Sequence, residues 1–137
     1  MKRLTNNNKG FTLIELMLVI AIIGIMASIA IPMVQSMAAT AYDSSAKSDV
    51  TNIVKATTAL IGLGKGGAIT LSGEVVGSSE NPDIFHLSDG VTGTVAGFSG
   101  TTLQDCFLAI SLNHSRGSKT YNYVFDGATG TSEFSES

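Results

Sequence analysis

The chain has 137 residues, of which 44% are hydrophobic and 14% are charged, so it is too apolar to be disordered and long enough for one domain. The formal net charge is −3, and the chain after residue 10 carries five basic and eleven acidic residues. This excess of acid is unusual for a nucleic-acid-binding protein, and no specific nucleic-acid site is expected. Cys106 is the single cysteine, which excludes an intramolecular disulfide and, with only two histidines, a zinc site of thiolates and imidazoles.

The N-terminal segment is basic and is followed directly by a long apolar stretch. Residues 1–10 hold three basic residues, whereas the 24 residues Leu16–Ala39 hold no charge. About 20 residues of α-helix cover the ~30 Å hydrocarbon core of a bilayer, so this stretch predicts a membrane-spanning helix. No further basic residue occurs before Lys47. The charge asymmetry therefore predicts a single pass with the N-terminus inside.

Glu15 lies near the start of this apolar stretch, where an ionised carboxylate is unfavourable unless it is paired or near the interface. One interpretation places it in the first helical turn at headgroup depth, where the helix dipole favours an anion. The second comes from the residues around it, which resemble the processing site of type IV pilins and of type II secretion pseudopilins: Lys9-Gly10-Phe11-Thr12-Leu13-Ile14-Glu15-Leu16.

The resemblance implies that a prepilin peptidase cleaves between Gly10 and Phe11 and methylates the new Phe11 amine. Residues 1–10 are then a leader peptide, and Glu15 becomes the fifth residue of the mature chain. In this family the acid at that position neutralises the N-terminal amine of a neighbouring subunit. A buried carboxylate and a buried ammonium are tolerable only as a pair, so the contact would also set the register of assembly.

After the apolar stretch the pattern becomes amphipathic, with apolar residues three and four apart and polar residues between them. The apolar set is Ala46, Val50, Ile53, Val54, Thr57, Leu60 and Ile61, and the polar set is Asp43, Lys47, Asp49, Asn52 and Lys55. The pattern predicts one helix of about fifty residues that Gly62 and Gly64 terminate.

Gly24 and Pro32 are the weak points of this helix, because an interior proline removes a backbone hydrogen bond. A kink in an intact helix is one interpretation of Pro32. In the resembled family the segment near this proline can lose helicity in the filament, which is the other. Small residues around Gly24 would let neighbouring helices approach closely.

Residues 65–137 contain four β-prone runs, which suffice for a small antiparallel sheet: 68–76, 91–98, 106–112 and 120–125. The run at 106–112 is apolar on both faces and is expected to be a central strand. Residues 113–119 are expected to join it to the next strand as a hairpin loop, and residues 126–137 to be a turn and a mobile tail. The predicted fold is α+β, with the long helix packed on the sheet, as in pilins.

No catalytic constellation or cofactor site is predicted. His86 and His114 are expected in different loops, away from a nucleophile and an orienting acid. Many pilins close a C-terminal loop with a disulfide, which this chain cannot do. Cys106 is therefore interpreted as a small buried residue, with an intermolecular bridge as the less favoured alternative.

The sequence thus predicts a structural subunit and not an enzyme, with a leader at 1–10, a hydrophobic helix at 11–41 and a globular head at 42–137. The first hypothesis is the major subunit of a type IV pilus, a homopolymer used in twitching motility, adhesion or DNA uptake. The alternatives are a type II secretion pseudopilin, a minor pilin and, least favoured, a membrane-anchored enzyme. The resemblance implies a prepilin peptidase, an assembly ATPase with an inner-membrane platform, and an outer-membrane secretin as partners. It also implies an inner-membrane location before assembly and an extracellular pilus afterwards.

Overall fold

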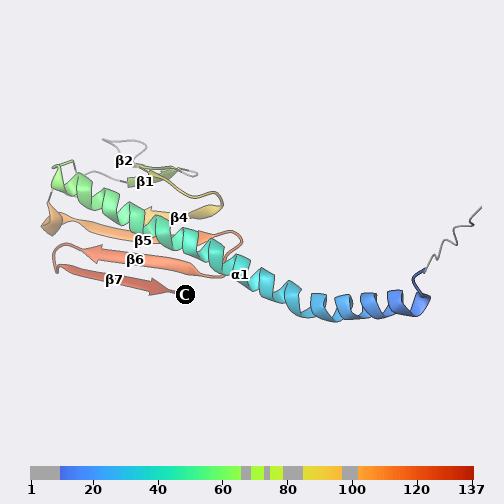
Figure 1. Ribbon diagram of the computed structural model, residues 1–137. Coiled ribbons are helices and arrows are strands. Elements are labelled where there is room, and N and C mark those ends of the chain that lie inside the picture. The colour runs from blue at the N-terminus through green and yellow to red at the C-terminus, as the bar shows by residue number, and fades with distance from the viewer. Residues whose placement is uncertain (1–9, 66–68, 73–74, 79–84, 97–101) are drawn as a thin grey trace, which may run out of the picture. The chain divides into compact units, whose positions relative to one another are not determined.

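The structure is a computed structural model that describes residues 10–65, 69–72, 75–78, 85–96 and 102–137. Its contacts divide the chain into two compact units, Met1–Ser36 and Met37–Ser137, and the second is called the head unit below. In chain order the elements are α1 (Leu13–Gly62), β1 (Ile69–Ser72), β2 (Val75–Ser78), β3 (Phe85–His86), β4 (Val91–Ala96), the 3₁₀ turn η1 (Leu103–Asp105), β5 (Phe107–His114), β6 (Thr120–Asp126) and β7 (Thr131–Glu136), as drawn in Figure 1.

The predicted helix is confirmed: α1 runs for 50 residues and includes Pro32 in its interior. It ends in a Schellman motif, in which the Lys65 N–H donates to the Leu60 carbonyl and the Gly64 N–H to the Ile61 carbonyl, both at 2.9 Å. Gly64 has a φ of 68°, a left-handed conformation that glycine adopts without strain. The helix therefore stops where the glycines predict.

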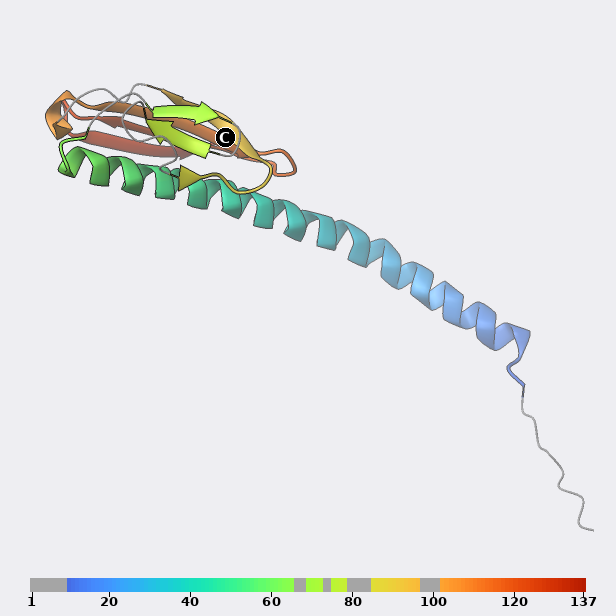
Figure 2. The same ribbon diagram turned by 90° about the horizontal axis from the view of Figure 1, so that it is seen from above.

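The part of α1 in the head unit lies along one face of the four-stranded sheet (Figure 2). Of the seven predicted apolar positions, Val54 is half-buried and the other six are buried, so the predicted amphipathic face is confirmed. The interpretation of the polar set is wrong at two positions, because Asp43 and Asp49 are buried as well, with 4% and 3% of their surface exposed.

The strands form two antiparallel sheets, one in the order β1-β2-β3 and one in the order β4-β5-β6-β7. The predicted run at 68–76 contains β1 and the beginning of β2, and the runs at 91–98, 106–112 and 120–125 correspond to β4, β5 and β6. β5 lies between β4 and β6, as predicted for a central strand, and Asn113 pairs with Thr120 across the predicted hairpin.

The prediction of a mobile tail is wrong for Thr131–Glu136, which form the edge strand β7. This strand pairs with β6 from Asp126↔Thr131 to Tyr121↔Glu136. The Ser137 and Thr120 backbones then exchange hydrogen bonds of 2.9 and 3.1 Å. All six residues of β7 are exposed, so the strand buries little apolar surface and its hydrophobic pattern is weak. Backbone pairing orders this segment, and a hydropathy pattern does not report such pairing.

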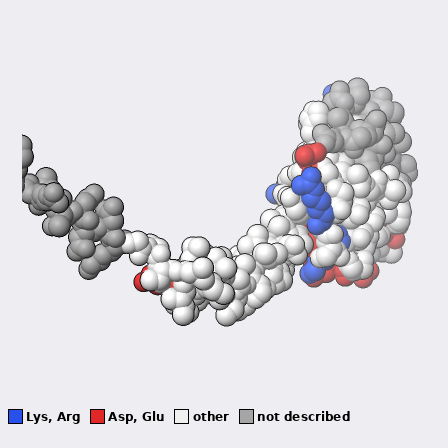
Figure 3. Space-filling view, turned by 90° about the vertical axis from the view of Figure 1, so that its right-hand side faces the viewer, with Lys and Arg blue, Asp and Glu red and all other residues white. Residues whose placement is uncertain are grey.

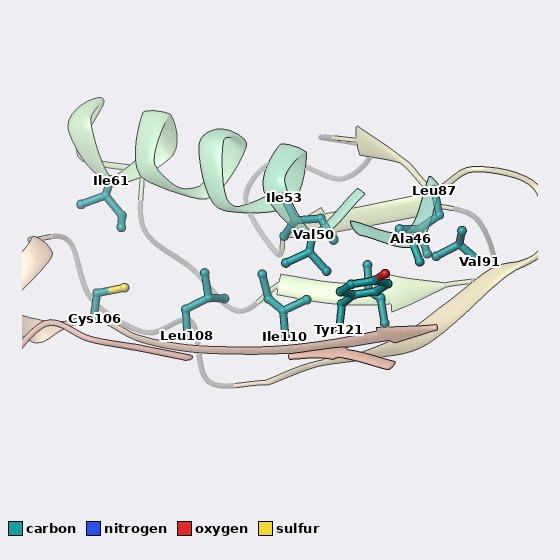
Figure 4. Close-up of a cluster of buried hydrophobic side chains, with 11 residues drawn as sticks. Ala46, Val50, Ile53, Ile61, Leu87, Val91, Cys106, Leu108, Ile110 and Tyr121 are labelled. Atoms are coloured by element: carbon teal, nitrogen blue, oxygen red, sulfur yellow. The ribbon is translucent and has the colours of Figure 1, made fainter. Parts of the chain in front are cut away.

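The core lies between α1 and the four-stranded sheet. Side chains of α1, such as Val50 and Ile53, point toward Leu108 and Ile110 of β5 (Figure 4). Burial alternates along β5, so Leu108, Ile110 and Leu112 face the helix. The opposite face of this strand is only partly covered, because Phe107 remains 46% exposed.

Two buried carboxylates of α1 hold the loops of the head unit. The Asp43 carboxylate accepts hydrogen bonds from the Ser118 N–H at 2.8 Å, the Ser118 hydroxyl at 2.9 Å and the Lys119 N–H at 3.1 Å. The Asp49 carboxylate accepts from the N–H and hydroxyl of Ser88 at 2.7 and 3.1 Å. Gly117 lies so close to Asp43 that a β-carbon there would collide with the carboxylate. The β5–β6 and β3–β4 connections are therefore both tied to the helix.

We expect Asp43→Ala to lower the free energy of unfolding of the head unit by about 2–3 kcal/mol, because three donors lose a charged acceptor in a buried place. The measurement is chemical denaturation of the full chain in detergent micelles, followed by the signal of its tyrosines. Glu133→Ala removes the same charge from the exposed strand β7 and is expected to change stability by less than about 0.5 kcal/mol. Equal stability of the two variants would contradict this role of Asp43.

The same contact predicts a loss of stability in acid. Burial raises the pKa of the Asp43 carboxyl, but the hydrogen bonds from Ser118 and Lys119 outweigh it and hold the pKa below its ordinary value of 3.8. The contribution is therefore present above the pKa of the unfolded chain and is lost as the pH falls through the folded value. Wild type should lose its stability advantage over Asp43→Asn between about pH 5 and about pH 2 in urea titrations. A constant difference over this range would refute the linkage.

Candidate functional site

The N-terminus of α1 is closed by its own side chains. The Thr12 hydroxyl accepts from the Glu15 N–H at 3.3 Å, while Glu15 Oε2 accepts from the Thr12 N–H at 2.9 Å and from the Thr12 hydroxyl at 2.8 Å. Thr12 directly precedes Leu13, the first helical residue, and Glu15 lies three residues after Thr12. This reciprocal pair is a capping box, which satisfies backbone donors that a helix start leaves without partners.

The capping box explains how the Glu15 carboxylate is held in the single chain. Both hydrogen bonds of the Glu15 side chain end on Oε2, and within the described residues Oε1 accepts none. Glu15 is exposed, in the first turn, where the helix dipole favours an anion. One carboxylate oxygen thus caps the helix, and the other is open to a further donor.

Thr12 is a site residue that the sequence reasoning missed, since it assigned only Glu15 to this end of the helix. The signal was present in the sequence, because a threonine followed three residues later by a glutamate, just before an apolar run, is the capping-box pattern. The two interpretations of Glu15, a place in the first helical turn at headgroup depth and pairing with another chain, are both compatible with this geometry, because the cap uses Oε2 and leaves Oε1 open.

The described part of the first unit presents an apolar surface on all sides of the helix. Phe11 is 85% exposed, and every large hydrophobic side chain from Leu13 to Val34 remains at least 45% exposed. Within the described residues, Glu15 is the single charged side chain before Asp43. α1 is long and apolar enough to cross a membrane by length and composition. A surface of this kind is stable in lipid or against other apolar helices, and not in water.

The helix presents Gly24 and Pro32 within this surface. A β-carbon at Gly24 would meet nothing within 4 Å, so the space beside it is open in the single chain. Pro32 lies inside α1 without ending it. The structure places Gly10, Phe11, Glu15, Gly24 and Pro32 along one segment, the N-terminal part of the chain. It does not bring Cys106 into that segment, since Cys106 belongs to the core of the head unit.

The Cys106 thiol is free and only 2% exposed. Burial raises the pKa of this thiol, which disfavours the reactive thiolate. It borders an apolar cavity of about 180 Å³ in the head unit, lined by Val54, Thr57, Thr58, Ile61, Cys106, Leu108, Tyr123 and Phe125. The geometry matches a small buried residue more closely than a bridge to another chain.

The two histidines lie on strands and not in loops, which corrects the sequence-based expectation. His86 ends β3 and is exposed, whereas His114 ends β5 and is buried against Tyr42. Within the described ranges, no three side chains of the metal-ligating types gather into one group.

The chain matches the family described as the prokaryotic N-terminal methylation motif over residues 5–31. It is 42% identical over 84 residues to a fimbrial protein of Pseudomonas aeruginosa, a region that covers 61% of this chain and 49% of that protein. It is 52% identical over 48 residues to the type IV major pilin protein PilA of Myxococcus xanthus, covering 35% of this chain and 22% of the relative. A type IV major alpha-pilin of Moraxella bovis is 73% identical over 30 residues, which cover 22% of this chain and 19% of the relative.

A long apolar N-terminal helix packed on a small antiparallel sheet, preceded by a methylation motif, defines the pilin class of proteins. These matches confirm that the chain is similar to type IV pilins, as the sequence indicated. It spans about half the length of the P. aeruginosa relative and less of the others. No solved structure gives a significant match.

The capping box predicts a specific effect of Thr12. Thr12→Ala should raise the amide hydrogen-exchange rates of the first turn of α1 about fivefold, since loss of a threonine cap costs a helix roughly 1 kcal/mol. Thr12→Ser keeps the hydroxyl and should leave the rates near those of wild type. The measurement is site-resolved exchange on the full chain in micelles, with amides near Gly62 as the internal reference. Equal rates in the Ala and Ser variants would show that the hydroxyl has no capping role.

Proposed function

We propose that this protein is the major structural subunit of a type IV pilus, and not an enzyme. The observation that carries the proposal is the apolar helical surface from Phe11 to Val34, with a single carboxylate at its start. Such a surface can replace its contacts with lipid by contacts with the same helix of other subunits, and no additional apolar area becomes exposed to water. Two of the relatives are named as major pilins, which favours a major over a minor subunit.

The proposal assigns residues 1–10 to a leader peptide, 11–41 to the membrane and filament helix, and 42–137 to the globular part. A prepilin peptidase would cleave between Gly10 and Phe11, both of which are exposed, and methylate the Phe11 amine. Cleavage creates a cationic amine next to the capping box. Before assembly the subunit would reside in the inner membrane with its N-terminus inside, and afterwards in an extracellular filament.

Glu15 has a defined role in this scheme. Its Oε2 is engaged by Thr12, so the open oxygen Oε1 would accept the methylated amine of a neighbouring subunit. In an apolar filament core this pair is favourable only when both charges meet, so it would select one axial register. Gly24 would allow close helix approach, and Pro32 would mark the place where the helix yields under extension.

The remaining partners follow from the family: an assembly ATPase on an inner-membrane platform and an outer-membrane secretin. Twitching motility, adhesion and DNA uptake are properties that the filament would have together with these machines. The alternatives are a pseudopilin of a type II secretion system, which would stay in a short periplasmic fibre, and a minor pilin, and the same experiment distinguishes them.

The test is mass spectrometry of filaments sheared from cells that express the protein. We expect it to be the dominant species, with an N-terminal peptide that begins at methylated Phe11. A processed chain that stays in the envelope would instead indicate a pseudopilin or a minor subunit. A chain that still begins at Met1 would overturn the proposed processing.

In the same experiment, Glu15→Ala should be inserted and processed but absent from the sheared fraction, because the neighbouring amine would enter the apolar core without a counter-charge. Glu133→Ala, which removes an exposed acid of the head unit, is the control and should assemble normally. Normal filaments from Glu15→Ala would refute the pairing.

A further inference from the structure

The β5–β6 loop, Ser115–Lys119, contains two cations of the head unit, Arg116 and Lys119. It lies against α1 at Asp43. Three hydrogen bonds from Ser118 and Lys119 to Asp43 fix this loop against the helix. Asp43 is the first buried residue of α1. These hydrogen bonds therefore fix the position of the loop along the helix, at Asp43.

Arg116 is held in place by Tyr42, one residue before Asp43. Its Nη1 donates to the Tyr42 hydroxyl at 3.2 Å, and its guanidinium carbon lies 5.6 Å from the centre of the Tyr42 ring. Tyr42 also contacts His114, whose ring stacks on the Tyr42 ring with the ring centroids 4.4 Å apart. His114 Nδ1 accepts from the Arg116 N–H at 3.0 Å, which leaves Nε2 to donate to the Asp89 carbonyl, also at 3.0 Å.

Arg116 is exposed and keeps its charge available. Among the described residues, the one ion pair within 4 Å joins Lys119 and Glu136, at 3.0 Å, so Arg116 has no carboxylate at that distance. Asp89 is an acid that acts on it electrostatically. Figure 3 shows Lys and Arg side chains in a row on one side of the head unit, with acidic groups toward the ends of the row.

The uncharged part of the chain ends directly beside this arrangement, at Tyr42. From Glu15 to Tyr42 the chain advances 27 residues with no charge between Glu15 and Asp43. Measured along a helix this is about 40 Å, and a bilayer with its headgroups is about 40–45 Å thick. In a membrane-spanning helix that begins with Glu15 at the inner interface, Tyr42 would therefore lie in the outer headgroup layer, where tyrosine side chains are favoured. The guanidinium beside it would face lipid phosphates.

We propose that, before assembly, Arg116 and Tyr42 form a headgroup contact in which the guanidinium binds the phosphate of an anionic phospholipid and docks the β5–β6 loop on the outer surface of the inner membrane. This rests on the membrane stage of the proposed function. Arginine suits the role because its planar donors pair two at a time with phosphate oxygens. On assembly the subunit leaves the bilayer and must give up this contact.

The test uses the full chain in vesicles of phosphatidylcholine with or without phosphatidylglycerol, at equal ionic strength. A fluorophore is attached to Ser115→Cys in a Cys106→Ala background. Quenchers attached to lipids at headgroup depth reduce its fluorescence when the loop is docked, so the quenching measures the docked population. We expect the docked population to be about fivefold higher with phosphatidylglycerol, the attraction of one arginine to an anionic surface. Arg116→Gln should remove this difference, and Lys55→Gln, which alters an exposed cation thirteen residues after Tyr42 on α1, should keep it.

Flotation of the vesicles distinguishes the two levels of the proposal. A chain that floats but shows equal quenching in both vesicles, or unchanged quenching in Arg116→Gln, would overturn the headgroup contact and leave the proposed function standing. A chain that floats with neither vesicle would overturn the membrane stage and the contact with it. Loss of the phosphatidylglycerol effect on adding inorganic phosphate, but not on adding sodium chloride of equal ionic strength, would show a small-anion site in place of a membrane contact.

Discussion

A helix surface that is apolar from Leu16 to Val34 is stable only where water is absent, and the rest of the molecule depends on this constraint. An α-helix satisfies its own backbone in such a place, whereas an irregular segment would leave polar groups without partners. Only the first turn of the helix has backbone N–H groups without helical partners in the apolar segment, and Thr12 and Glu15 provide hydrogen bonds there from within the chain. The one carboxylate in the apolar segment therefore has a structural role within the single chain.

Beyond Tyr42 the same helix holds the strands and loops of the head unit, and it does so with two buried acids in addition to its apolar face. Asp43 and Asp49 each accept hydrogen bonds from a loop of the head unit, and Gly117 leaves the room that Asp43 needs. A buried carboxylate with several donors is a directional contact, unlike apolar packing, so it determines where a loop lies on the helix. The placement of Arg116 beside Tyr42 is a consequence of this contact.

The features that sequence reasoning predicted well depend on residues close together in the chain. The apolar periodicity of α1, its glycine stop and the β5–β6 hairpin are of this kind. The N-terminal methylation motif, matched at residues 5–31, is local as well. The capping box is equally local, so the role of Thr12 could have been predicted from the sequence. The family assignment rests on this same N-terminal region, which the methylation motif matches at residues 5–31.

The features that were missed depend on residues far apart. Asp43 lies three residues before Ala46 and Asp49 four residues before Ile53, which is the spacing of the buried face, but charged side chains are normally exposed. Their hydrogen-bond partners lie 75 and 39 residues away, so nothing near them in the sequence shows what would satisfy a buried carboxylate. β7 is polar and exposed, and its order comes from backbone pairing with β6. The sequence by itself determined the apolar helix, its single carboxylate and the family, because side-chain hydropathy and local motifs carry that information. Only the tertiary structure decided the buried acids, the edge strand and the Arg116–Tyr42 contact, because directional hydrogen bonds form between segments whose proximity the folded chain creates.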